Sequence, residues 1–166
     1  MNLKKISDKC KKIKLVISDV DGVLTDGGMY YSKNGEIMKK FNAKDGMGVE
    51  LLLQNKIKTV LLTSESSTIA KKRGKKINAA MVITGAKNKK LHLQSICKKF
   101  NVSPQQIGYI GDDLNDHQII QLIGLSATPS DGIMLLKKTV DYVCKNDGGN
   151  GAFREFTDLI LKYNNL

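Results

Sequence analysis

Two aspartates stand two positions apart at the end of the first apolar run of the sequence. Asp19 and Asp21 follow Leu15-Val16-Ile17-Ser18, and alternate side chains of an extended segment point to the same side. Carboxylates so close raise each other's pKa unless a cation neutralises them, and their oxygens suit Mg²⁺. Gly22 then lets the backbone turn sharply and approach a ligand. The pattern predicts a Mg²⁺ site at the end of this strand.

A second group of acids follows a later apolar run, residues 107–110. Asp112, Asp113 and Asp116 crowd one predicted strand-to-helix turn. These acids can simply complement the positive end of the dipole of the following helix. Asp112, however, falls at the strand tip, where it can complete a metal site with Asp19.

Two hydroxyls and a lysine follow two other apolar runs. Thr63-Ser64 ends the run 58–62, and a hydroxyl pair with a free amide at a helix start is suited to binding phosphate. The alternative is an ordinary N-cap for the helix predicted from Ser66. Lys89 opens another predicted helix, where the helix dipole disfavours a cation. Because lysines also occupy positions 87 and 90, a solvated helix face stays open as the alternative for Lys89.

These residues need a scaffold that brings the ends of several strands together. Short β-branched apolar runs predict strands at 13–20, 58–62, 80–83, 107–110 and 142–143, and helical periodicity predicts helices at 45–54, 66–76, 89–100, 113–123 and 152–163. This alternation favours βαβ units and a mostly parallel sheet, whose right-handed crossovers place helices on both faces. The sequence therefore predicts a three-layer, Rossmann-like α/β fold, in which ligands bind at the carboxyl ends of the strands.

One segment interrupts the alternation. Residues 28–41 hold two short strand-like stretches around Ser32-Lys33-Asn34-Gly35, and Asn-Gly is a strong signal for a hairpin turn. We expect a β-hairpin that projects just after the first strand. Residues 1–166 otherwise predict a single domain without linker or repeat, in which residues 1–12 and the last few residues fray.

Composition limits the class of partner. The chain has 166 residues, is 41% hydrophobic and carries a formal net charge of +11. Its lysines are scattered in pairs and only 5% of residues are aromatic, which disfavours a nucleic-acid stacking surface. No apolar stretch reaches the length of a membrane span, and the run after the basic N-terminus is too short for a signal peptide. We therefore expect a cytoplasmic protein with no nucleic-acid or membrane partner, and reduced thiols at Cys10, Cys97 and Cys144.

Four segments in this order resemble the haloacid dehalogenase-like phosphotransferase superfamily. They are DVDGVLTDG from Asp19, the Thr63-Ser64 pair, Lys89 before a helix, and GDDLND from Gly111. The resemblance implies a phosphatase in which Asp19 attacks phosphorus and forms an aspartyl-phosphate. It implies that Asp21 protonates the leaving alcohol and then activates water.

The same resemblance assigns the metal and phosphate ligands. It implies that Asp19, the backbone carbonyl of Asp21 and Asp112 bind Mg²⁺. Three further residues are implied to hold the transferring phosphoryl group: Thr63, Ser64 and Lys89. Asp113 or Asp116 is implied to orient the metal shell or Lys89.

Over residues 13–163 the chain is similar to a narrower, capless group. Only about 40 residues separate Asp21 from Thr63, which leaves room for a hairpin and a helix and not for a cap domain. The segments DVDGVLTDGGMYY, KKFNAKDGMGVELL, GDDLND and GGNGAFREF resemble the 3-deoxy-D-manno-octulosonate 8-phosphate phosphatases and the 2-keto-3-deoxy-nononate and N-acylneuraminate 9-phosphate phosphatases. The resemblance implies a homotetramer in which a neighbour's hairpin covers each active site. It also implies that the C-terminal tail, residues 146–166, reaches toward the substrate.

Two departures concern the sugar. The octulosonate enzymes typically read Thr-Gly-Arg where this chain reads Thr63-Ser64-Glu65, and they tend to carry an arginine where it has Glu50. Glu65 with Lys76 resembles the nine-carbon pattern, so a nine-carbon substrate is slightly favoured and the eight-carbon 8-phosphate is the alternative. The candidate specificity residues are Asn42, Lys44, Asp45, Gly46, Glu65, Arg73 and Lys76. Three other readings stay open: a general phosphatase, a phosphoacceptor resembling response regulators, and a phosphate-binding subunit without activity.

Overall fold

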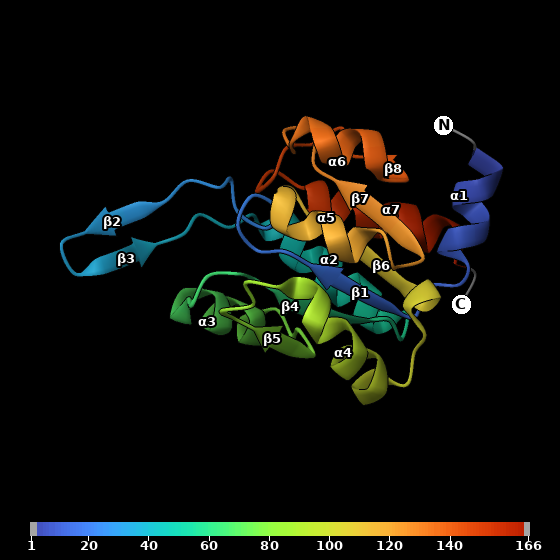
Figure 1. Cartoon of the computed structure of the whole chain (residues 1–166), viewed down its shortest axis with the longest axis horizontal. Helices are drawn as coiled ribbons and strands as arrows, with labels where there is room; N and C mark the ends of the chain where they lie inside the picture. Colours follow the sequence, from blue (N-terminus) through green and yellow to red (C-terminus); the bar gives the residue numbers. More distant parts are fainter. Residues whose placement is uncertain (1–2, 165–166) are drawn as a thin grey trace.

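A computed structural model describes residues 3–164 as one six-stranded sheet between two layers of helices (Figure 1). All six strands are parallel, in the spatial order β5-β4-β1-β6-β7-β8. Their bounds are β1 Leu15–Ser18, β4 Lys58–Leu62, β5 Met81–Ile83, β6 Ile107–Ile110, β7 Leu125–Thr128 and β8 Tyr142–Val143. The structure confirms the predicted three-layer α/β fold, and no cap domain stands between β1 and β4 in the described chain.

Helices cover both faces of the sheet. One apolar core lies beneath α1 Leu3–Cys10, α2 Ala43–Gln54, α3 Thr68–Lys76 and α7 Ala152–Tyr163. The other lies beneath α4 Leu93–Phe100, α5 Leu114–Ile120 and α6 Met134–Thr139, with short 3₁₀ turns at η1 Lys89–His92 and η2 Pro104–Gln106. No helix between residues 3 and 164 is long and apolar enough to cross a membrane.

The central strand β1 contributes to both cores. Val16 belongs to the core under α2 and α7, whereas Leu15 and Ile17 belong to the core under α4 and α5. Every residue of β1 is buried, because a strand covered on both faces has no solvent side. With β4 on one side and β6 on the other, the carboxyl end of β1 lies in the middle of the sheet edge.

Three elements differ from the prediction. The expected fraying of residues 1–12 is wrong for residues 3–10, which form α1 and bury Ile6 and Cys10 against the core.

Strand β7 and helix α6 were not predicted because their sequence signals are weak: β7 reads Leu-Ser-Ala-Thr and α6 has only six residues. A contact outside the strand also holds β7, because the Ser126 amide and hydroxyl both donate to Asp141 Oδ2, at 3.0 and 3.1 Å. Residues 1–2 and 165–166 lie outside the described chain.

The predicted hairpin projects away from the sheet at the end opposite α1 (Figure 1). Its strands are β2 Tyr30–Ser32 and β3 Gly35–Met38, paired antiparallel around the Lys33-Asn34 turn. The side chains of β2 and much of β3 are exposed. The hairpin ends where Thr25 and Phe41 form an isolated bridge.

Because Ile6 is 3% exposed within the core that α7 shares, we expect Ile6→Ala to destabilise the protein by about 2 kcal/mol. Urea denaturation followed by circular dichroism measures this loss. Lys4→Ala, on the exposed face of the same helix, serves as the control and should leave the midpoint unchanged. Equal midpoints for both variants would mean that α1 adds nothing to the folded state.

Candidate active site

The predicted site residues meet at the carboxyl edge of three neighbouring strands. Asp19 follows β1, Thr63 follows β4, and Asp112 comes two residues after β6. Asp19 and Asp112 line a cavity of about 230 Å³, whereas Thr63 is not part of its lining. Its lining consists of Asp19, Asp21, Gly22, Gly27, Met29, Ser64, Glu65, Asp112, Asp113 and Asn115.

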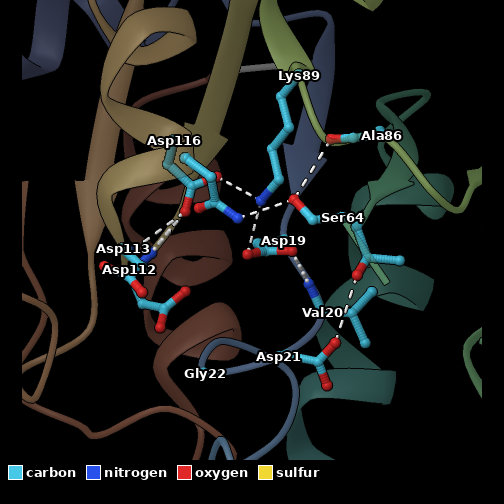
Figure 2. Close-up of polar contacts among 12 residues, drawn as sticks. Asp19, Val20, Asp21, Gly22, Ser64, Ala86, Lys89, Asp112, Asp113 and Asp116 are labelled. Atoms are coloured by element: carbon cyan, nitrogen blue, oxygen red, sulfur yellow. Dashed lines mark hydrogen bonds and ion pairs between the residues drawn. The ribbon is translucent and has the colours of Figure 1, made fainter. Parts of the chain in front are cut away.

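The end of the Lys89 side chain lies between the carboxylates of Asp19 and Asp116 (Figure 2). Its Nζ is 2.7 Å from Asp19 Oδ2 and 2.6 Å from Asp116 Oδ1, and its side chain is fully buried. Burial alone would lower the pKa of Lys89, but the charges of Asp19 and Asp116 outweigh it and hold that pKa above the ordinary value. The alternative of a solvated helix face is therefore wrong for Lys89.

Asp19 is fixed at both of its oxygens. Oδ1 accepts the Val20 amide at 2.7 Å, and Oδ2 faces Lys89. Burial raises the pKa of Asp19 to about 7, although Lys89 opposes the rise. A carboxylate oriented from both ends, with a cation beside it, suits a group that must meet a phosphoryl group in one geometry.

Asp19, Asp112 and Asp116 form the one acidic group among residues 3–164 whose oxygens lie close enough together, within 4.8 Å, to hold a metal ion. Asp116 is already engaged by donors. Its Oδ1 faces Lys89 and accepts the Tyr109 hydroxyl at 2.5 Å, and its Oδ2 accepts the backbone amides of Asp112 and Asp113. This leaves Asp19 and Asp112 as the candidate cation ligands. Asp116 contacts Lys89, and its orienting role stays a prediction.

The charges of the cluster fit a divalent cation. Burial, reinforced by the charges of Asp19 and Asp116, raises the pKa of Asp112 to about 8. A hard cation with oxygen ligands would relieve this repulsion. Gly22 leaves the necessary space, because a Cβ at this position (φ +79°) would stand 2.0 Å from Asp112 Oδ2.

The hydroxyl pair Thr63-Ser64 does not cap a helix. The N-cap of α3 is Ser67, whose side chain accepts the Ala70 amide at 3.2 Å, so the N-cap alternative is wrong. Ser64 Oγ accepts from Asn115 Nδ2 at 2.9 Å and donates to the Ala86 carbonyl at 3.3 Å. Thr63 Oγ1 donates to Asp21 Oδ2 at 3.3 Å.

Asp113 lies at the start of α5, where its carboxylate can complement the helix dipole, as the structural alternative predicted. It is the N-cap of α5, and its Oδ1 accepts the Leu114 amide at 2.7 Å. It also lines the cavity. The side chain of its neighbour Asp112 takes no part in the cap and lines the cavity.

Comparison with known proteins places the chain in a family. The haloacid dehalogenase-like hydrolase family matches residues 53–156. The 3-deoxy-D-manno-octulosonate 8-phosphate phosphatase of Haemophilus influenzae is 36% identical over 157 residues, which cover 95% of this chain and 87% of that relative. The chain belongs to the haloacid dehalogenase-like hydrolases. The relative confirms the predicted resemblance and the prediction of a phosphoric monoester hydrolase.

Solved structures of other family members have the same fold. The cobalt-bound Haemophilus influenzae phosphatase is 36% identical, with a TM-score of 0.91 over 94% of this chain and 91% of that chain. The Moraxella catarrhalis 3-deoxy-D-manno-octulosonate 8-phosphate phosphatase is 35% identical, with a TM-score of 0.93 over 98% and 93% of the two chains. That structure is a complex with a magnesium ion, a phosphate ion and a KDO molecule, which supports the predicted Mg²⁺ cofactor.

In this family member the candidate specificity residues do not gather at one place. Glu65 lines the catalytic cavity. Gly46, Arg73 and Lys76 line a second hollow beside α2 and α3, and Lys44 lines a third beside α7. Within one chain, six of the seven predicted positions therefore lie outside the cavity lining.

Three of these positions, Asn42, Asp45 and Arg73, make contacts between helices. Asn42 is the N-cap of α2, and its carbonyl accepts from Arg73 Nη2 at 3.0 Å. Asp45 is buried, and its Oδ1 accepts the Arg154 amide in the first turn of α7 at 3.0 Å. These contacts tie α2 to α3 and α7, and a role in substrate choice stays a prediction for all three residues.

The C-terminal tail packs beside the catalytic loop. The Gly149 amide donates to the Val23 carbonyl at 2.9 Å. A Cβ on Gly148 would stand 1.9 Å from the Gly22 carbonyl oxygen, so only glycine permits this approach. The tail thus supports the loop that carries Asp21.

Three residues that touch the site carry no sequence signal of this role. In the sequence Tyr109 is one residue of an apolar strand segment, Asn115 is a polar residue of GDDLND, and Lys39 is one of many paired lysines. Tyr109 reaches Asp116, Asn115 reaches Ser64, and Lys39 reaches Asp21. Each contact depends on two separate segments meeting at the sheet edge.

The raised pKa values predict a pH-dependent response to metal. Because burial raises the pKa of Asp19 to about 7 and the pKa of Asp112 to about 8, the folded protein holds protons that the unfolded chain releases. These two acids therefore destabilise the metal-free fold as pH rises from about 4 to about 8. Mg²⁺ binds the deprotonated form, so about 10 mM Mg²⁺ should raise Tm more at about pH 8.5 than at about pH 5.5.

Differential scanning calorimetry of EDTA-treated protein measures these shifts. Asp112→Asn should remove most of the Mg²⁺ effect at the higher pH, whereas Asp8→Asn on the exposed face of α1 should keep it. Equal Mg²⁺ shifts at both pH values would contradict the assignment of these ligands.

Proposed function

We propose that the chain is a Mg²⁺-dependent phosphatase that hydrolyses the terminal phosphate monoester of a 2-keto-3-deoxy sugar acid through an aspartyl-phosphate. The observation that carries this proposal is the arrangement of Asp19, held between the Val20 amide and Lys89 and facing Asp112 across the cavity. Relatives named as sugar acid phosphatases over nearly the whole chain support the substrate class.

The proposed mechanism follows from what each side chain can do. Asp19 attacks phosphorus, a new Asp19 oxygen–phosphorus bond forms, and the bond to the sugar oxygen breaks. Asp21 gives a proton to that leaving oxygen. Water then attacks the phosphorus of the aspartyl-phosphate and passes a proton to Asp21. The bond between the Asp19 oxygen and phosphorus breaks, which frees the Asp19 carboxylate and releases phosphate.

Charge balance limits how the phosphate binds. Five acids line the cavity, namely Asp19, Asp21, Glu65, Asp112 and Asp113. Lys89, the Ser64 hydroxyl and the backbone amides after β4 supply positive charge and hydrogen bonds to the phosphoryl oxygens. Mg²⁺, held by Asp19, Asp112 and the Asp21 carbonyl, would supply the remaining neutralisation.

The named relatives make the eight-carbon 8-phosphate the first substrate to propose. One observation favours the nine-carbon alternative. Glu65 lines the cavity, and it stands where the octulosonate pattern has an arginine. We expect that arginine to contact the substrate carboxylate. Like charges at that place disfavour the shared carboxylate contact.

The test is phosphate release from both sugar acid phosphates with Mg²⁺. We expect a higher kcat/KM for the eight-carbon 8-phosphate, and a preference for the nine-carbon 9-phosphate would establish the alternative. Asp19→Asn should lower kcat at least about 1,000-fold with unchanged circular dichroism, while Asp8→Asn keeps full activity. Unchanged hydrolysis by Asp19→Asn would refute the mechanism.

We also propose a homotetramer in which hairpins cover neighbouring active sites. Four apolar hairpin side chains are more than half exposed: Met29 54%, Tyr31 58%, Ile37 59% and Met38 52%. An apolar group of this size on a projecting arm is typical of an interface, and closed symmetry would bury it.

Light scattering at micromolar concentration should give four times the 18.3 kDa chain mass. Tyr31→Ser combined with Ile37→Ser should shift the protein to smaller species. Leu91→Ser, which removes an exposed apolar side chain from η1, should leave the mass unchanged. A monomeric wild-type protein would contradict the proposal.

A further inference from the structure

Lys39 has an environment unlike that of a surface lysine. It follows β3 directly, on the return limb of the hairpin. Its side chain is 0% exposed, whereas the side chain of the next residue, Lys40, is 65% exposed. The hairpin therefore turns one lysine inward and the other outward.

The buried ammonium group of Lys39 forms ion pairs with two carboxylates. Lys39 Nζ lies 2.5 Å from Asp21 Oδ1 and 2.5 Å from Glu36 Oε1. An ammonium removed from water is costly unless it is paired on several sides, so this burial is sustained by both contacts. Lys40, in contrast, reaches Asp26 at 3.1 Å on the surface.

The contacts continue into the framework. Glu36 Oε2 accepts the Ser67 hydroxyl at 2.8 Å, and Ser67 is the N-cap of α3. Lys39 is thus anchored through Glu36 to the start of a helix that packs on the sheet. The chain of contacts runs from α3 through the hairpin to Asp21.

Asp21 is consequently held at both oxygens. Lys39 contacts Oδ1 and the Thr63 hydroxyl reaches Oδ2 at 3.3 Å. These contacts come from opposite sides, one from the hairpin and one from the end of β4. Together they set the direction in which the carboxyl group faces the cavity.

We propose that Lys39 is a positioning residue for Asp21, so that the hairpin of each chain orients the acid–base group of its own active site. This inference rests on the proposed phosphatase function. In the first step Asp21 must place its proton on the ester oxygen as the phosphorus–oxygen bond breaks. In the second it must accept a proton from the water that attacks the aspartyl-phosphate, so misorientation slows both steps.

The leaving group separates this role from a general structural one. A sugar alkoxide needs the proton from Asp21, but a p-nitrophenolate leaves without one. Lys39→Met should therefore lower kcat for the sugar acid phosphate about 10- to 100-fold with little change in KM. With p-nitrophenyl phosphate the same variant should show a rapid burst of one p-nitrophenol per active site, followed by slow turnover limited by water attack.

Three further variants complete the experiment. Lys39→Arg, which keeps the charge, should recover part of kcat, and Glu36→Gln, which loosens the far contact, should show a weaker form of the same pattern. Lys40→Met, the matched control on the same limb of the hairpin, should behave as wild type. Thermal unfolding of each variant is measured alongside, and Glu36→Gln carries the test if Lys39→Met does not fold.

The outcomes distinguish this inference from the proposed function. Wild-type protein that hydrolyses neither ester would refute the phosphatase itself. Active wild-type protein with unchanged kinetics in Lys39→Met overturns the inference alone. Equal loss of both substrates without a burst also overturns it, because that result would mean that Lys39 supports the fold of the whole site.

Discussion

The buried ammonium group of Lys89 forms ion pairs with two carboxylates, and the other residues of the site are arranged around these ion pairs. Asp19 and Asp116 pair with it at 2.7 and 2.6 Å, and removing either partner would leave a buried charge uncompensated. Asp116 is in turn held by the Tyr109 hydroxyl and two backbone amides. The position of the proposed nucleophile is therefore set by a network that reaches from β1 through η1 to β6 and α5.

Close backbone packing is the second constraint on the site. The loop after β1 must bring Gly22 against Asp112 and also accept Gly148 from the C-terminal tail. A side chain at Gly22 or at Gly148 would push the loop after β1 away from Asp112 or from the tail. Gly22 would then no longer line the cavity beside Asp112. The tail thus packs against the loop after β1 through its backbone, while the cavity lining comes from residues after β1, β4 and β6 together with Gly27 and Met29.

The sequence predicts what depends on local pattern. Residues 58–62 and 107–110 are short segments rich in β-branched and other apolar residues, and the strands there have the predicted bounds. Strand β7 escapes prediction because two of its four residues carry hydroxyls, and α1 because its packing surface is distant in sequence. Lys89 could be read in two ways for the same reason: its partner Asp116 is 27 residues away, and no local pattern shows that a lysine is buried.

The hairpin has two proposed roles, one in assembly and one in catalytic geometry. A capless member of this family has no domain to cover its active site, so exposed apolar side chains on β2 and β3 suit a cover supplied to a neighbour. The buried lysine at the base of the same arm contacts Asp21 of its own chain. Because Glu36 ties that lysine to α3, a displaced hairpin would disturb both the proposed acid–base group of its own site and the proposed cover of a neighbouring site. In such an arrangement, assembly and catalytic geometry depend on the same few contacts at the base of the hairpin.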